Sequence, residues 1–330
     1  MKAELAVLLL LGAVPALARS RAPKHLPDAD AALATITSFP AQPCAARGRV
    51  QFFRPGLKPK GLGTTVYTLP DGRLRREVRD KGPRKPAAQV IVDDGGTQSV
   101  YLAKASLLWS GAVAREPSAR TLSRLKSIYT VAVSTGGHVA KLATWRLNFF
   151  APGGPLRRSF WVDRKTGLLL KTETYRYDGT LSRRERLVKL EIPAQVDPAL
   201  FARAAPSGTA ARPLIPPDPP VAGIAARFPR WAPLGFLPLE ARARDGGALI
   251  AYGDGEARFT VFEGPAGASS GLDERLGREV RLPDGMTARL LPAGDGAALV
   301  RRTGAGLLVV SGDLADEELA RVAESLEEAR

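Results

Sequence analysis

Residues 159–176 read SFWVDRKTGLLLKTETYR and predict two antiparallel β-strands joined by a tight turn. Ser159–Asp163 and Leu168–Arg176 are rich in apolar, aromatic and threonine residues, which favour strands. The segment between them, Lys165-Thr166-Gly167, is polar and ends in glycine, which is typical of a hairpin turn. This hairpin sets the pattern for the whole first part of the chain.

Strand patterns continue on both sides of the hairpin. Turn signals at Pro70-Asp71-Gly72 and Asp93-Asp94-Gly95-Gly96 join neighbouring strands, and helical spacing predicts helices at Asp28–Ile36 and Ser118–Ile128. Many strands with short turns and two helices indicate one large antiparallel sheet with helical cover, an α+β fold. The other predicted strands are Arg49–Arg54, Gly63–Leu69, Arg73–Arg79, Gln89–Val92, Gln98–Leu102, Ala143–Phe150 and Leu187–Ile192.

A proline-rich stretch divides the chain. Residues 204–221 read AAPSGTAARPLIPPDPPV, which favours an extended, semi-rigid segment. After it, five strand patterns and an amphipathic helix beginning at Asp316 predict a smaller α+β domain. We therefore predict domains at 19–203 and 221–330, separated by a linker at 204–220.

The N-terminus has the pattern of an export signal. A short basic start is followed by an apolar run, Leu5–Val14, and the small-x-small sequence Ala16-Leu17-Ala18. We expect residues 1–18 to be a signal peptide and the mature chain to lie in the periplasm. A short membrane anchor is the alternative, but the run is shorter than the ~20 apolar residues that span a bilayer.

Basic charge is concentrated in the first half. Arg19–Arg212 holds 34 Lys and Arg against 14 Asp and Glu, whereas Pro213–Arg330 holds 13 against 18. A basic domain attracts nucleic acid, anionic lipid or an acidic protein. Export and the absence of arginine–aromatic interleaving argue against nucleic acid. Anionic lipid, an acidic partner and a merely solvated basic face remain as interpretations.

Catalytic patterns are weak, and we predict no enzyme, cofactor or metal. Gly267–Gly271 matches G-x-S-x-G, but a Pro-Gly loop precedes it and both histidines, His25 and His138, lie upstream. Neither histidine has further Cys or His residues near it at the spacing of a zinc site. Cys44 is the single cysteine, and a buried, neutral thiol is its expected state.

Segments of both predicted domains resemble a known family. Phe160–Lys171, followed by Tyr177-Asp178-Gly179, is similar to the hairpin that ends the first domain of the RseB/MucB regulators of envelope-stress sigma factors. In the second domain, W-x-P-x-G-F at Trp231–Phe236 and Y-x-D-G-x-x-x-F-x-V at Tyr252–Val261 resemble elements of the RseB/MucB C-terminal domain in the same order. V-V-x-G-x-L at Val309–Leu314 and a helix that holds Ala320 and Val322-Ala323-Glu324-Ser325 complete the resemblance.

The resemblance implies both a fold and a role. The fold is a LolA/LolB-like curved antiparallel sheet, a half-barrel over helices, followed by the smaller domain. The role is periplasmic binding to the ectodomain of a membrane anti-sigma factor, with release when lipid or lipopolysaccharide occupies the protein. A periplasmic lipid or lipoprotein carrier is the alternative, although simple carriers of the LolA type lack a second domain.

Candidate binding residues follow from these expectations. An apolar pocket between sheet and helices is expected to take acyl chains, and arginine pairs at nearby turns are expected to form an anionic-ligand rim. For each aromatic residue, simple core packing is the alternative. The pocket candidates are Trp109, Tyr129, Trp145, Phe149, Phe150 and Trp161, the rim candidates are Arg157, Arg158, Arg183 and Arg184, and the partner-binding candidates are Trp231, Phe236, Tyr252 and Phe259.

Overall fold

The computed structural model describes residues 26–36, 39–80, 86–113, 116, 118–202, 204–214, 220–221, 224–225, 227–304 and 306–327. The predicted signal peptide, His25 and residues 215–219 of the predicted linker lie outside them. The chain divides into two compact units. One contains Ala6–Leu122 and Tyr129–Arg212, and we call it the N-terminal unit; the other contains Ser123–Ile128 and Pro213–Arg330, and we call it the C-terminal unit.

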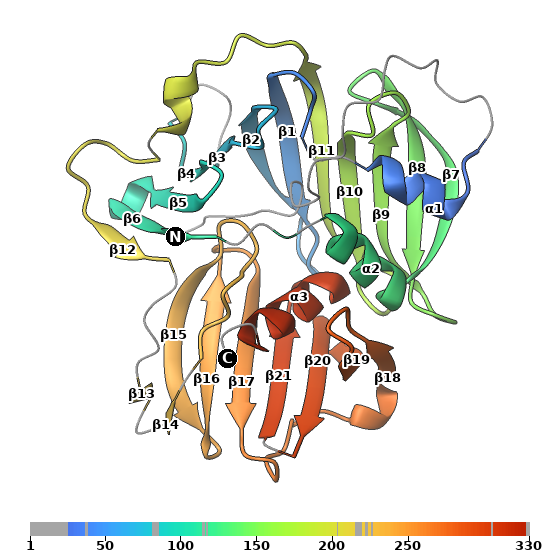
Figure 1. The fold of residues 1–330 in the computed structure, drawn as a ribbon, viewed down its shortest axis with the longest axis vertical. Coiled ribbons are helices and arrows are strands. Elements are labelled where there is room, and N and C mark those ends of the chain that lie inside the picture. Colours follow the sequence, from blue (N-terminus) through green and yellow to red (C-terminus); the bar gives the residue numbers. More distant parts are fainter. Residues whose placement is uncertain are drawn as a thin grey trace. The chain divides into compact units, whose positions relative to one another are not determined.

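A twelve-stranded sheet forms the N-terminal unit, in the order β12-β6-β5-β4-β3-β2-β1-β11-β10-β9-β8-β7 (Figure 1). In this order, every strand from β6, near one end of the sheet, to β7, at the other end, runs antiparallel to its neighbour. The strands are β1 (Cys44–Phe52), β2 (Lys60–Thr68), β3 (Leu74–Arg79), β4 (Gln89–Asp93), β5 (Thr97–Leu102), β6 (Leu107–Ala112), β7 (Thr130–Val139), β8 (Leu142–Phe150), β9 (Leu156–Asp163), β10 (Leu169–Tyr175), β11 (Leu181–Glu191) and β12 (Ala211–Pro213).

The predicted hairpin at 159–176 is confirmed as β9 and β10, and its turn shows why the motif residues are needed. The Asp163 carboxylate accepts hydrogen bonds from the Thr166 backbone N–H at 2.9 Å and from its hydroxyl at 2.7 Å. At the next turn, the Asp178 carboxylate accepts the Thr180 N–H at 2.8 Å, and Gly179 takes a φ of +82°. Both turns therefore depend on an aspartate that fixes its own loop.

Helices accompany this sheet. Helix α1 (Ala29–Thr35) begins at the predicted cap, because the Asp28 carboxylate accepts the Ala31 N–H at 2.7 Å. It packs on β7 and β8 through buried Ala32 and Leu33 (Figure 1). Helix α2 (Ser118–Ile128) has the predicted bounds, but its second half, Ser123–Ile128, belongs to the C-terminal unit. The 3₁₀ helices of this part are η1 (Ala103–Ala105) and η2 (Pro198–Phe201).

Part of the predicted linker is structured. Ala211–Pro213 forms β12 beside β6, and Ala204 packs with Phe201, Leu69, Val90 and Val92 in a core cluster. A further pair of short strands follows, β13 (Pro220–Val221) and β14 (Ile224–Ala225).

The C-terminal unit contains a seven-stranded antiparallel sheet in the order β15-β16-β17-β21-β20-β19-β18. Helix α3 (Asp316–Glu327) packs on β20 and β21, with Leu319 and Val322 fully buried (Figure 1). The strands are β15 (Leu237–Arg244), β16 (Gly247–Gly253), β17 (Arg258–Gly264), β18 (Arg278–Arg281), β19 (Thr287–Ala293), β20 (Gly296–Thr303) and β21 (Gly306–Gly312), with η3 (Glu274–Leu276) before β18. The predicted fold class is thus confirmed in both domains.

Candidate functional site

The large sheet has two chemically different faces. Along β1, Ala46, Val50 and Phe52 are buried while Arg47 and Arg49 are exposed, because successive strand residues point to opposite sides. We call the side of Val50 the inner face and the side of Arg49 the outer face. The strand register places the predicted site residues that lie in this sheet on one face or the other.

The inner face holds a buried ion pair. Arg76 Nη2 of β3 lies 2.5 Å from Glu185 Oε1 of β11, and both side chains are about 97% buried or more. Three inter-strand steps separate these strands, which is about 14 Å in a flat sheet. The two side chains meet because the sheet curves around its inner face, as expected for a half-barrel.

Two of the predicted pocket aromatics contact each other. The rings of Tyr129 and Phe149 meet edge to face at 5.6 Å, and Phe149 lies 4.6 Å from Phe160. All three are 95% buried or more. Quadrupolar attraction between such rings stabilises this cluster in addition to the burial of its area.

Trp145 and Trp161 lie on opposite faces. Arg146 of β8 pairs directly with Trp161 of β9, so these two side chains share a face, and Trp145 points to the other. Trp161 is covered by Lys171, whose Nζ is 3.6 Å from the ring centroid, and by Arg146 at 4.8 Å. Trp145 is instead stacked by the Arg164 guanidinium at 3.8 Å.

Trp109 and Phe150 occupy two further places. Trp109 is half-buried on β6, near the opposite edge of the sheet, with the Arg212 guanidinium 5.8 Å from its ring. Phe150 is half-buried at the end of β8, opposite Thr130. The structure therefore brings Tyr129 and Phe149 together but does not gather the six aromatic residues around one space.

The four predicted rim arginines are engaged by the protein itself. Arg157 and Arg158 are 96% buried or more, and they stack on Tyr177 at 3.8 Å and on Phe160 at 4.9 Å. Arg183 and Arg184 contact carboxylates, with Arg183 3.5 Å from Glu185 and Arg184 2.6 Å from Glu173. An incoming anion would compete with these internal contacts.

Glu173 is the centre of a polar cluster on the outer face. Its carboxylate accepts hydrogen bonds from Tyr175 at 2.5 Å, Lys171 at 2.9 Å and Arg184 at 2.6 Å. Burial opposes ionisation of Glu173, but these donors outweigh it and hold its pKa below the ordinary value of 4.5. Burial, followed by the bond to Glu173, raises the pKa of Tyr175 to about 12. The cluster is thus a fixed ion pair with a neutral phenol.

The predicted partner-binding residues pack the interior of the C-terminal unit. Tyr252 and Phe259 stack with centroids 4.8 Å apart, and Phe236 lies 5.5 Å from Phe259. Trp231 lies under the Arg321 guanidinium of α3 at 4.2 Å. All four aromatic side chains are 93% buried or more, so a partner would meet the surface that they support.

Helix α2 contributes a charged contact that the sequence did not indicate. Arg124 Nη2 lies 2.7 Å from Glu324 Oε2 of α3, and both side chains are 98% buried. A hydrogen-bonded pair at this depth fixes the segment Ser123–Ile128 against α3 within the C-terminal unit. The two residues stand 200 positions apart, so no local pattern connects them.

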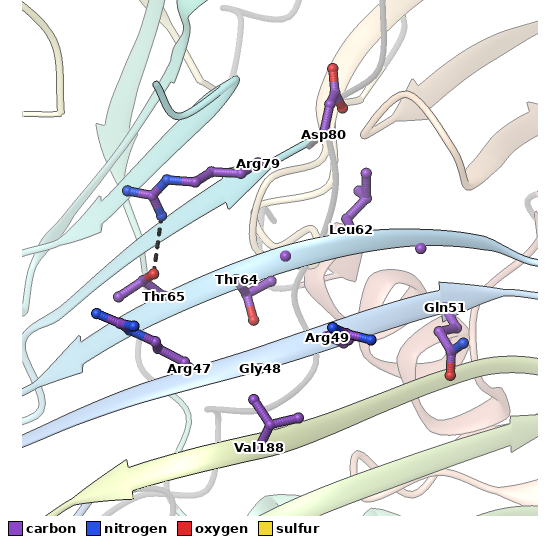
Figure 2. A pocket seen from close by; sticks show the side chains of 12 residues that line it. Arg47, Gly48, Arg49, Gln51, Leu62, Thr64, Thr65, Arg79, Asp80 and Val188 are labelled. Carbon is purple, nitrogen blue, oxygen red and sulfur yellow. Dashed lines mark hydrogen bonds between the residues drawn. The ribbon is translucent and has the colours of Figure 1, made fainter. Parts of the chain in front are cut away.

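A surface depression on the outer face was also not predicted. It encloses about 370 Å³ over β1, β2, β3 and β11, and Arg47, Arg49 and Arg79 surround it (Figure 2). Gly61 and Gly63 form part of its floor. The spacing Arg47-x-Arg49 could have indicated two arginines on one face of a strand. The strand predicted at Arg49–Arg54 began too late to include Arg47.

The G-x-S-x-G segment and the predicted turn at Asp93-Asp94 are both irregular segments between secondary-structure elements. Gly267–Gly271 is a loop, and the serine of its G-x-S-x-G pattern, Ser269, accepts the Gly271 N–H at 3.1 Å. Asp93 and Asp94 accept backbone N–H groups of their own turn, which confirms the turn interpretation. Within the described ranges, no group of three His, Cys, Asp or Glu side chains is placed to hold a metal ion. No helix among the described residues is long and apolar enough to cross a membrane.

The architecture defines a class: a protein with a curved twelve-stranded sheet followed by a seven-stranded antiparallel sheet. No family model and no curated protein matches the chain. Among solved structures, the chain is similar to MucB. The complex of Pseudomonas aeruginosa MucA and MucB matches with 24% identity and a TM-score of 0.45, over 90% of this chain and 97% of that one.

Further solved structures extend this likeness. MucB in complex with MucA(peri) matches with 23% identity and a TM-score of 0.44 over the same shares of the two chains. A LolA superfamily protein from Nitrosomonas europaea matches 53% of this chain and 97% of its own, with 10% identity and a TM-score of 0.29. The resemblance drawn from the sequence is thus found among solved structures as well, and it concerns the fold.

Proposed function

We propose that this protein is a periplasmic regulator that acts by binding the ectodomain of a membrane anti-sigma factor. The carrying observation is the C-terminal unit, whose core is built from the motif residues Trp231, Phe236, Tyr252 and Phe259. A simple carrier of the LolA type has no such unit. The similar protein MucB has been solved with MucA(peri), which supports a partner of this kind.

The proposed signal for release is lipid or lipopolysaccharide. The inner face of the curved sheet offers apolar surface, and the Tyr129, Phe149 and Phe160 cluster lies within the N-terminal unit. These rings are packed against one another, so an acyl chain enters only by displacing them. That displacement is the proposed link between lipid binding and release of the partner.

The second candidate is a lipid or lipoprotein carrier. It is favoured by the large curved sheet, and it requires no partner ectodomain. The two functions differ in a measurable way. A regulator forms a stable complex that lipid dissolves, whereas a carrier moves lipid or a lipoprotein from one membrane to another without such a complex.

Titration calorimetry of the mature chain against each anti-sigma ectodomain encoded in the same genome tests the proposal. We expect one ectodomain to bind and lipopolysaccharide to dissolve the complex. Phe149→Leu should change the lipopolysaccharide concentration needed for release while leaving ectodomain affinity intact. The matched control is Phe262→Leu in the core of the C-terminal unit, which should leave the release concentration unaltered. Binding to no ectodomain, together with lipid transfer between vesicles, would establish the carrier instead.

A further inference from the structure

Four cations on the outer face carry charge that the protein does not neutralise. Arg47, Arg49, Arg186 and Lys189 are exposed, and among the described residues none of them makes an ion pair or a side-chain hydrogen bond. Other cations of the same face do find carboxylates. Arg79 contacts Glu77 at 2.5 Å, and Lys171 contacts Glu173 at 2.9 Å.

The strand register sets these cations against one another. Arg49 of β1 stands directly opposite Arg186 of β11, and Arg47 stands opposite Lys189. Arg186 also stands opposite Lys171 of β10. Like charges at directly opposed positions destabilise a sheet, so folding alone does not favour this arrangement. An anionic ligand bound between these cations would offset the repulsion between them.

Two glycines of β2, Gly61 and Gly63, leave the sheet surface beside these cations free of side chains. Gly63 lies opposite Arg49 on one side and opposite Arg79 on the other, and Gly61 lies opposite Gln51. A Cβ at Gly61 or Gly63 would come no closer than 3.8 Å to any neighbour, so packing does not demand glycine there. Glycine inside a strand weakens it, and it often marks a place where another group approaches the backbone closely.

The depression joins these features. Its lining includes Arg47, Arg49, Gly61 and Gly63, and Figure 2 shows the Arg47 and Arg79 side chains on either side of Thr65. Arg79 donates to the Thr65 hydroxyl at 3.0 Å, which holds its guanidinium at this edge. The result is a shallow space of about 370 Å³ with three arginines around a floor that carries no side chains at the two glycines. One carboxylate, Asp80, also lines it, and that carboxylate is paired with Lys104 at 3.2 Å.

We propose that this outer-face patch, Arg47, Arg49, Arg186 and Lys189 with the Gly61–Gly63 floor, docks the protein on the phosphate groups of an anionic membrane surface. Guanidinium groups bind phosphate oxygens in a bidentate manner. The cations lie in rows over β1 and β11 instead of converging on one point, which suits an array of headgroups more than a single phosphate.

An acidic protein segment fits this surface less well. β1 and β2 are each paired on both sides, so neither has a free edge on which a peptide could add as a strand. Of the two large apolar residues that line the depression, Val188 is 52% exposed and Leu62 is buried, and a protein interface normally needs larger apolar anchors. Docking of this kind uses a different face from the proposed acyl-chain site, so the two can be tested separately.

Vesicle flotation of the full mature chain tests the proposal, with vesicles of phosphatidylcholine alone and of phosphatidylcholine containing one-third phosphatidylglycerol. We expect binding to the anionic vesicles only, weakening as salt is raised. Each basic residue near such a surface contributes about fivefold in partitioning. Arg49→Gln combined with Arg186→Gln should therefore reduce binding about 25-fold.

Two matched variants distinguish binding at this particular patch from non-specific attraction by the net charge of the protein. Arg242→Gln with Arg244→Gln removes the same charge from exposed β15 and should change binding less than about twofold. Gly63→Val fills the floor without changing charge and should weaken binding severalfold while circular dichroism stays unchanged.

Equal losses in the two arginine pairs would overturn the proposal in favour of non-specific attraction. Equal binding to neutral and anionic vesicles would overturn it as well. Binding of polyglutamate but not of vesicles, with the same dependence on Arg49 and Arg186, would replace the membrane by an acidic protein.

Discussion

Removing one partner of the buried Arg76–Glu185 pair should destabilise the N-terminal unit severely. Glu185→Leu leaves the Arg76 guanidinium, 3% exposed, on the inner face without the carboxylate that lies 2.5 Å away. Breaking a buried pair in this way costs about 3–5 kcal/mol of unfolding free energy. The exposed pair Lys104–Asp80, with Lys104 66% exposed, is the matched control, and Lys104→Ala should cost less than about 1 kcal/mol.

The measurement is urea unfolding followed by tryptophan fluorescence. Trp109, Trp145 and Trp161 all lie in the N-terminal unit, so a common Trp231→Phe background makes the signal report that unit alone. Arg76→Met combined with Glu185→Leu should recover part of the loss, because it removes the buried Arg76 charge, while Arg183, 3.5 Å from Glu185 and 12% exposed, still loses its carboxylate. A loss for Glu185→Leu no larger than for Lys104→Ala would refute the reasoning. So would a double variant as unstable as the single one.

Three further outcomes are expected. Gly312→Ala should unfold the C-terminal unit at a much lower temperature in calorimetry, because φ is +151° and a Cβ would meet the Arg258 carbonyl oxygen at 2.2 Å; Gly304→Ala, with open space around it, should leave the transition unchanged. Cys44 should resist a thiol reagent at pH 8 until the protein is unfolded, because burial raises its pKa to about 11; rapid labelling of the native protein would contradict this. The depressed pKa of Glu173 contributes stability above pH 4.5 that is lost as pH falls through its lower folded pKa, so Glu173→Gln should flatten the acid dependence of unfolding, and an unaltered pH profile would exclude that contribution.

Strands with strong local signals were predictable, and weak ones were not. The hairpin of β9 and β10 has apolar strands and a turn fixed by an aspartate, so its local sequence is enough to predict it. Strand β7 reads TVAVSTGGHV and β6 reads LLWSGA, and their small and polar residues give no clear alternation. Both become strands because a neighbouring strand offers hydrogen-bond partners, which is a property of the assembled sheet.

The candidate site was harder to predict than the fold. Aromatic residue type pointed to Trp145 and Trp161 alike, yet the register sends them to opposite faces. Arg157 and Arg158 were expected at a rim, but they are buried against Tyr177 and Phe160. Residue type indicates what a side chain is able to bind, and only packing determines whether it reaches solvent.

The sequence by itself determined the elements whose stabilising hydrogen bonds join residues close together in the chain. An aspartate cap begins α1, Asp163 and Asp178 fix the turns on either side of β10, and the net positive charge is concentrated in the first half of the chain. The tertiary structure decided what distant residues do together. Arg76 meets Glu185, Arg124 meets Glu324, and Arg49 is placed opposite Arg186, because sheet curvature, helix packing and strand register join positions that no local pattern connects.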